Sequence, residues 1–241
     1  MAGFRSIYIA AAVFFVGLPR EDAAPLGNDH LVPLSEYRFQ RGPGAEYRKL
    51  WQRKLLVTPG NVARFAHIPG FAQPEVVVCV DKRPNQKEGL PGGYWVTFTE
   101  ASESLWNCIP TGDEKFTGRG VADARAVKVR RCDAPLPETT ARTICTLWLK
   151  MLTKSTPLPE RCFGVDSPTE NFAAINPDGR LLEAEAPSCE SKNTSELIRI
   201  GFLLLDYCNA DNGKRAELAR KIEDRASALL ARVSRSKNAK K

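Results

Sequence analysis

The stretch Val76-Val77-Val78-Cys79-Val80 decides the fold, together with residues 94–99, which read YWVTFT. The first run is almost wholly β-branched, so it predicts a strand in the middle of a sheet. The second run alternates in side-chain character, which predicts a strand with two different faces. The Pro- and Gly-containing segment 81–93 separates them as a loop. Further strands are expected at 62–68 and 124–132.

The second half of the chain predicts helices. Apolar residues recur at spacings of three and four over 137–152, 195–208 and 214–233, which is typical of helices that bury one face. A shorter helix is expected over 45–56. Between the first two long helices, Asn176-Pro177-Asp178-Gly179 is a strong turn signal, and it predicts a hairpin with strands at 172–175 and 181–186. The order of these elements predicts the α+β class, with an antiparallel sheet and helices packed on one face.

The N-terminal segment resembles an export signal. Residues 6–18 carry no charge and follow Arg5, and thirteen residues are too few to span a bilayer as a helix, which needs roughly 20. We therefore expect a signal peptide at 1–24, a disordered arm or linker at 25–43, a single α+β domain at 44–234 and a basic tail at 235–241. The expected location is the periplasm or the exterior, with no stable membrane span.

The net charge of +7 is confined to one end of the chain. Residues 214–241 contain ten Lys and Arg and three acidic residues, and this difference equals the whole excess. The remainder is neutral overall, so the sequence predicts no specific binding of nucleic acid. Binding of a polyanion through the basic C-terminal tail stays open as an alternative function.

The seven cysteines all follow the signal segment, at positions 79, 108, 132, 145, 162, 189 and 208. None forms a CxxC pair, so zinc and redox motifs are not indicated, and neither a metal nor a cofactor is expected. In an oxidising compartment disulfides are expected. Cys162 with Cys189 would close the predicted hairpin, and Cys145 with Cys208 would join two predicted helices, although spacing alone does not fix the pairing.

Motifs for catalysis are absent from the sequence: it has no P-loop, GxGxxG, HExxH or GxSxG. A hydrolase that uses carboxylates or histidine nevertheless remains an alternative function. His67 would be its base, since the other histidine, His30, lies in the predicted arm. Glu183 and Glu185, on one face of the hairpin, could form a carboxylate pair.

Aromatic residues suggest a binding surface instead. In the strand at 94–99, Trp95 shares a face with Thr97 and Thr99, while Tyr94, Val96 and Phe98 point the other way. If the second set belongs to the core, Trp95, Thr97 and Thr99 are the candidate ligand-binding residues.

Several segments carry a resemblance to a known group: Pro74-Glu75, YWVTFTEASESLW at 94–106, WLKML at 148–152, and Val165, Asp166 and Phe172. Over roughly residues 60–210 the chain resembles a group of uncharacterised exported bacterial proteins. The resemblance implies an exported α+β domain without assigned chemistry. The sequence thus predicts an exported, non-enzymatic binding protein, an inhibitor or immunity-like partner of another envelope protein.

Overall fold

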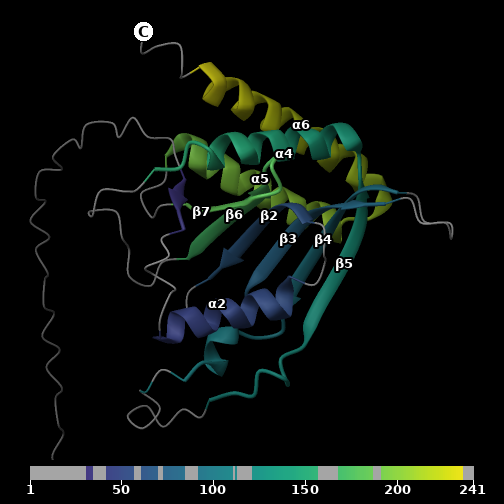
Figure 1. The fold of residues 1–241 in the computed structure, drawn as a ribbon. Helices are drawn as coiled ribbons and strands as arrows, with labels where there is room; N and C mark the ends of the chain where they lie inside the picture. Colours follow the sequence, from purple (N-terminus) through teal and green to yellow (C-terminus); the bar gives the residue numbers. More distant parts are fainter. Residues whose placement is uncertain are drawn as a thin grey trace, which may run out of the picture.

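A seven-stranded antiparallel sheet forms the centre of the molecule in the computed structural model (Figure 1). The structure describes residues 31–34, 42–56, 61–69, 73–84, 92–110, 112, 121–156, 168–186 and 191–235. The strand order is β1-β7-β6-β2-β3-β4-β5. The strands are β1 (Val32–Pro33), β2 (Asn61–Ile68), β3 (Val76–Arg83), β4 (Gly93–Ala101), β5 (Val129–Leu136), β6 (Thr169–Ile175) and β7 (Leu181–Glu185).

Helices cover both faces of this sheet (Figure 1). On one face lie α4 (Glu138–Leu152) and α5 (Lys192–Asn209), and α6 (Asn212–Arg235) packs over both as an outer layer. The other face carries α2 (Gly42–Leu55) and the short 3-10 helix η1 (Leu105–Cys108). The predicted α+β class and antiparallel sheet are confirmed, and the three long helices share one face as expected. The fourth helix differs, because Tyr47, Leu50 and Trp51 give α2 an apolar side of its own, and it buries this side on the opposite face.

The larger core lies between the sheet and the three long helices. Phe65, Phe98, Phe172 and Trp148 are at most 2% exposed there. The indole Nε1 of Trp148 donates a 3.0 Å hydrogen bond to the carbonyl of Arg64, which ties α4 to β2. This bond satisfies the polar atom of a buried tryptophan, as such cores require.

The smaller core lies beneath α2 and is organised around a buried carboxylate. Glu75, 1% exposed, accepts hydrogen bonds from the hydroxyl of Tyr47 at 2.6 Å and from the amide of Leu105 at 2.9 Å. The hydroxyl of Ser104, which caps η1, adds a third donor at 3.2 Å. One side chain thus connects the start of β3 to both α2 and η1.

The predicted hairpin is confirmed, and its turn follows from side-chain chemistry. The Oδ1 atom of Asn176 accepts hydrogen bonds from the amides of Asp178 and Arg180 at 3.1 and 2.8 Å. Gly179 has φ +78°, a conformation that glycine adopts without a steric cost. β6 and β7 then pair with Ile175 opposite Leu181.

Two sequence predictions need adjustment. The strand predicted at 124–132 begins later, at Val129, and continues to Leu136. Within the predicted disordered arm at 25–43, Val32–Pro33 pairs with β7, and Gly42 and Pro43 already belong to α2. Burial of Leu31 explains why this part of the predicted arm is structured: its side chain is fully buried in the larger core. The predicted signal peptide and the last six residues of the predicted tail lie outside the described residues.

In the described part of the chain, no helix combines the length and the apolar character needed to cross a membrane.

Candidate functional site

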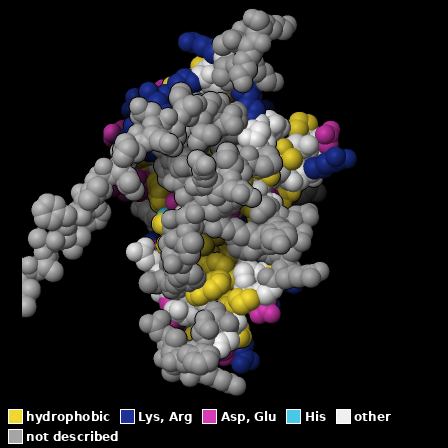
Figure 2. All heavy atoms as spheres, turned by 90° about the vertical axis from the view of Figure 1, so that its left-hand side faces the viewer, with side chains coloured by type: hydrophobic (Ala, Val, Ile, Leu, Met, Phe, Trp, Pro, Cys, Tyr) yellow, Lys and Arg dark blue, Asp and Glu magenta, His cyan; other side chains and the backbone are white. Residues whose placement is uncertain are grey.

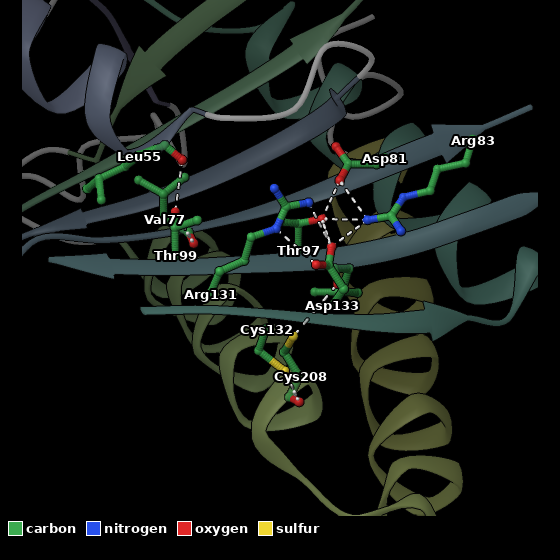
Figure 3. Close-up of polar contacts among 11 residues, drawn as sticks. Leu55, Val77, Asp81, Arg83, Thr97, Thr99, Arg131, Cys132, Asp133 and Cys208 are labelled. Atoms are coloured by element: carbon green, nitrogen blue, oxygen red, sulfur yellow. Dashed lines mark hydrogen bonds and ion pairs between the residues drawn. The ribbon is translucent and has the colours of Figure 1, made fainter. Parts of the chain in front are cut away.

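A polar cluster occupies the face of the sheet that carries α2, where β3, β4 and β5 lie side by side. Side chains alternate along a strand, so odd-numbered residues of these three strands share this face. In register, Cys79 lies opposite Thr97, and Thr97 lies opposite Asp133. The cluster consists of Asp81, Arg83, Thr97, Arg131 and Asp133 (Figure 3), together with Trp95, whose ring lies against Arg83.

Thr97 stands at the centre of the cluster. Its hydroxyl contacts Oδ2 of Asp81 on β3 and, at 2.8 Å, Oδ1 of Asp133 on β5. A hydroxyl has a single proton, so Thr97 donates to one of these carboxylates at a time. Asp81 is 2% exposed, and the guanidinium of Arg83 approaches its Oδ2 at 4.0 Å. Two carboxylates on different strands are thus brought together through one threonine.

Two arginines balance these carboxylates. Arg131 binds Asp133 with both Nε and Nη2, at 2.9 and 3.1 Å, which is the two-pronged geometry that suits guanidinium and carboxylate. Arg83 donates from Nη2 to Asp133 and to Thr97. Burial alone would raise the pKa of Asp133, but hydrogen bonds from Arg131, Thr97 and Arg83 outweigh it and lower the pKa to about 2. Asp133 is therefore ionised at neutral pH and is poorly suited to act as a general acid.

Trp95 completes the cluster on its outer side. The guanidinium carbon of Arg83 lies 4.5 Å from the centre of the Trp95 ring, within the range of a cation–π interaction. Trp95 is half-buried, and 26% of the Arg83 side chain is exposed. The arrangement presents an aromatic ring stacked on a guanidinium, and hydrogen bonds to Asp133 and Thr97 hold the guanidinium in place.

The sequence placed Trp95, Thr97 and Thr99 on one ligand-binding face, and the structure separates their roles. All three share the face, as alternation predicts, but Thr97 and Thr99 are each 2% exposed. The hydroxyl of Thr99 donates to the carbonyl of Leu55 at 2.9 Å, so it fastens the end of α2 rather than facing solvent. Trp95 alone of the three keeps a partly accessible side chain.

Glu183 and Glu185 do not form a solvated carboxylate pair. They share a face, but it is the face beneath α2. Glu183 accepts hydrogen bonds from Arg48 of α2 at 2.6 Å and from Arg64 of β2, while Glu185 is 5% exposed. Arg64 reaches Glu183 across Ala173, whose small side chain leaves room on the intervening strand. Glu183 therefore connects α2 to the sheet.

His67 has an acidic partner that the sequence did not assign to it. Its Nδ1 lies 3.1 Å from Oε1 of Glu170, and the two residues are paired in register on β2 and β6. Its ring also stacks edge-on against Phe202 of α5, with 5.2 Å between ring centres. Among the described residues, no hydroxyl or thiol hydrogen-bonds to His67.

Of the two predicted cysteine pairs, only Cys145 with Cys208 lies within the described residues. Cys145 and Cys208 are both free thiols, and Cys208 lies against Cys132 of β5 instead. The predicted partners Cys162 and Cys189 lie outside the described residues. In the part of the chain that the structure describes, no three His, Cys, Asp or Glu side chains are grouped as metal ligands.

Sequence reasoning missed most of the polar cluster because it misplaced two strand ends. The loop was expected to begin at residue 81, but β3 continues through Asp81 to Arg83. The strand expected to end at 132 continues past Asp133. The sequence did contain a signal for the longer strand. Val77, Cys79, Asp81 and Arg83 are spaced two residues apart, so a strand that continues beyond the apolar run places all four on one face.

Comparison with known proteins gives no relative: no family model, curated protein or solved structure matches the chain.

Proposed function

We propose that the protein is an exported, non-enzymatic binding protein that recognises another envelope protein through the Trp95–Arg83 pair. The observation that carries this proposal is the 4.5 Å stacking of Arg83 on Trp95, held from below by Asp133 and Thr97. An inhibitor or immunity-like protein acts by this kind of contact and needs no catalytic group.

Two physical arguments support this surface. Tryptophan and arginine are enriched among the residues that dominate binding energy at protein interfaces. Side chains already fixed in place lose little conformational entropy on binding, so more of the contact energy is expressed as affinity. Here the ring of Trp95 and the guanidinium of Arg83 restrict one another. Asp133 binds Arg83 and is itself held in place by Arg131.

The groups that a hydrolase would need are engaged elsewhere. Glu183 is bound by two arginines, and the ring of His67 contacts a carboxylate and a phenyl ring. A His–Glu contact is compatible with a catalytic base, so a His67 variant distinguishes the hydrolase alternative from the binding function.

The test compares partner capture by matched variants. The tagged full-length protein is expressed in its native envelope, cross-linked and purified, and the bound proteins are identified by mass spectrometry. Binding of the recovered partner is then measured for the wild type, Trp95→Ala and Arg83→Gln. We expect each substitution to weaken binding by roughly tenfold or more, the usual loss for a central interface residue.

Phe202→Ala is the matched control, since Phe202 is an aromatic residue that is 38% exposed on the opposite face of the sheet. Its affinity should equal that of the wild type. Unchanged affinity of Trp95→Ala would contradict the proposed surface. Turnover of a hydrolase substrate that is lost in His67→Gln would contradict the non-enzymatic function.

A further inference from the structure

Two thiols meet where the end of α5 approaches the edge strand β5. Cys132 Sγ lies 2.8 Å from the carbonyl oxygen of Cys208, and the thiol of Cys208, which donates to the carbonyl of Val96 at 3.7 Å, lies against that of Cys132. Figure 3 shows the two sulfur atoms pointing toward one another, on the side of the sheet opposite the polar cluster. Cys208 is fully buried and Cys132 is half-buried.

The surroundings hold both cysteines in this position. Tyr207, next to Cys208, donates its hydroxyl to the carbonyl of Pro135 on β5. Arg215 of α6 donates to the Cys208 carbonyl at 3.2 Å. On β5, Arg130 reaches Asn209, the last residue of α5. Hydrogen bonds on both sides of the sulfur atoms, from Tyr207 and from Arg130, therefore join α5 to β5.

We propose that Cys132 and Cys208 form a disulfide bond in the exported protein. The reaction is a thiol–disulfide exchange with an oxidant that itself carries a disulfide. The two thiols lose two protons and two electrons and gain one S–S bond, while the oxidant's S–S bond breaks and its sulfurs take up those electrons and protons as two thiols.

The burial of the two residues gives the order of the steps. Cys132 is the accessible sulfur, so its thiolate attacks the oxidant and forms a mixed disulfide. Cys208 then displaces the oxidant. Burial raises the pKa of Cys208 above its ordinary value, so the second step should accelerate as pH rises.

The bond would fix the strand that supports the proposed binding surface. Cys132 immediately precedes Asp133, whose side chain projects from the other face of β5 to hold Arg83. It would also close a long loop, because the two cysteines are 76 positions apart. Closing a loop of this length restricts the unfolded chain and stabilises the fold.

Peptide mapping of the oxidised full-length protein tests the proposal and separates it from the pairing expected from sequence. Trypsin places Cys132 in peptide 132–142, Cys145 in peptide 143–150 and Cys208 in peptide 200–214. After treatment with oxidised glutathione and digestion without reductant, we expect peptide 132–142 linked to peptide 200–214. Cys145→Ser should retain this linkage, and Cys132→Ser should lose it.

Thermal unfolding provides the second measurement. We expect dithiothreitol to lower the Tm of the oxidised wild type by about 10 °C more than that of oxidised Cys132→Ser, so that reduction of any other disulfide cancels in the comparison. Peptide 200–214 linked to 143–150, or both cysteines alkylated after oxidation of the folded protein, would overturn the proposal. Both measurements use the purified protein without a partner. Their outcome therefore does not depend on whether the Trp95 surface binds another protein.

Discussion

Gly201 shows how closely a helix can approach a sheet when a single side chain is missing. A Cβ atom at this position of α5 would lie 2.6–2.7 Å from three ring carbons of Phe65. The ring of Phe65 is 1% exposed and contacts Phe172 and Phe202, so it has no free space to move into. The glycine therefore sets the distance between α5 and β2.

Replacing Gly201 by alanine should destabilise the protein by about 1–3 kcal/mol, the usual cost of overpacking a core. The unfolding free energy is measured by urea denaturation. Gly213→Ala is the control, because its Cβ would meet only the Asp211 carboxylate at 3.4 Å and alanine favours the helix. Equal or higher stability of Gly201→Ala would contradict the close approach of α5 to Phe65.

Asp133 gives a prediction about pH. Its pKa in the folded state, about 2, is below its ordinary value of 3.8, so folding favours the ionised form. The resulting stabilisation is present above about pH 4 and is lost as the pH falls toward 2. The difference in unfolding free energy between the wild type and Asp133→Asn should therefore shrink over this range.

Urea denaturation at pH 7, 4, 3 and 2 measures this difference. Asp206→Asn, which changes an exposed carboxylate of α5, is the control and should show no comparable trend. A gap between wild type and Asp133→Asn that stays constant from pH 7 to pH 2 would show that the arginine contacts do not stabilise the ionised carboxylate.

At the scale of elements, α2 depends on a small number of polar contacts to hold it against the sheet. The Tyr47 hydroxyl donates to buried Glu75, and Thr99 donates to the carbonyl of Leu55 at the other end of the helix. Tyr47→Phe should cost about 1.5–3 kcal/mol, the usual range for a hydrogen bond to a charged group. Amides of α2 and η1 should then exchange hydrogen faster than in the wild type, whereas amides of α4 should exchange at the same rate.

Urea denaturation and hydrogen exchange both measure this effect. Tyr94→Phe is the matched control, since no hydrogen bond of its hydroxyl is seen among the described residues and the side chain is only half-buried. Unchanged exchange in α2 of Tyr47→Phe would show that Glu75 does not fasten this helix.

Periodicity predicted the elements better than their ends or their partners. The long helices α4, α5 and α6 follow from apolar spacing, because each buries one continuous stripe. The ends of β3 and β5 were missed because polar residues such as Asp81 and Asp133 continue the strands, and their partners lie on neighbouring strands rather than nearby in sequence. Such contacts depend on strand order, which the pattern of one chain does not specify.

The same dependence on strand order explains why the predicted partner of Cys208 differs from its neighbour in the structure. Cys208 was assigned a partner on a helix, but β5 is the strand next to β4, and this order brings Cys132 to the end of α5. Likewise, the smaller core beneath α2 could not be foreseen, because apolar spacing indicates that α2 buries one side but not which face of the sheet it covers.

At the scale of the whole molecule, positive charge is concentrated on the outermost layer. Figure 2 shows Lys and Arg side chains gathered at the height of α6 and hydrophobic side chains at the height of α2. Some of these arginines serve the fold: Arg225 pairs with Glu196 at 2.6 Å, and Arg215 binds the end of α5. The exposed Lys214, Arg220, Lys221, Arg232 and Arg235 project from α6.

This distribution gives the polyanion alternative a decisive test. Deleting residues 235–241 removes four positive charges, namely Arg235, Lys237, Lys240 and Lys241. If the tail contacts a sulfated polysaccharide, the deletion should weaken binding and flatten its dependence on salt, since fewer counterions are released. The control replaces four exposed basic residues elsewhere by glutamine, namely Lys49, Arg53, Arg125 and Lys128. This control matches the change in net charge. A larger loss of affinity in the deletion variant than in the control would therefore show that the tail itself contacts the polyanion. Equal losses in both variants would assign the binding to net charge alone and would contradict a specific role of the tail.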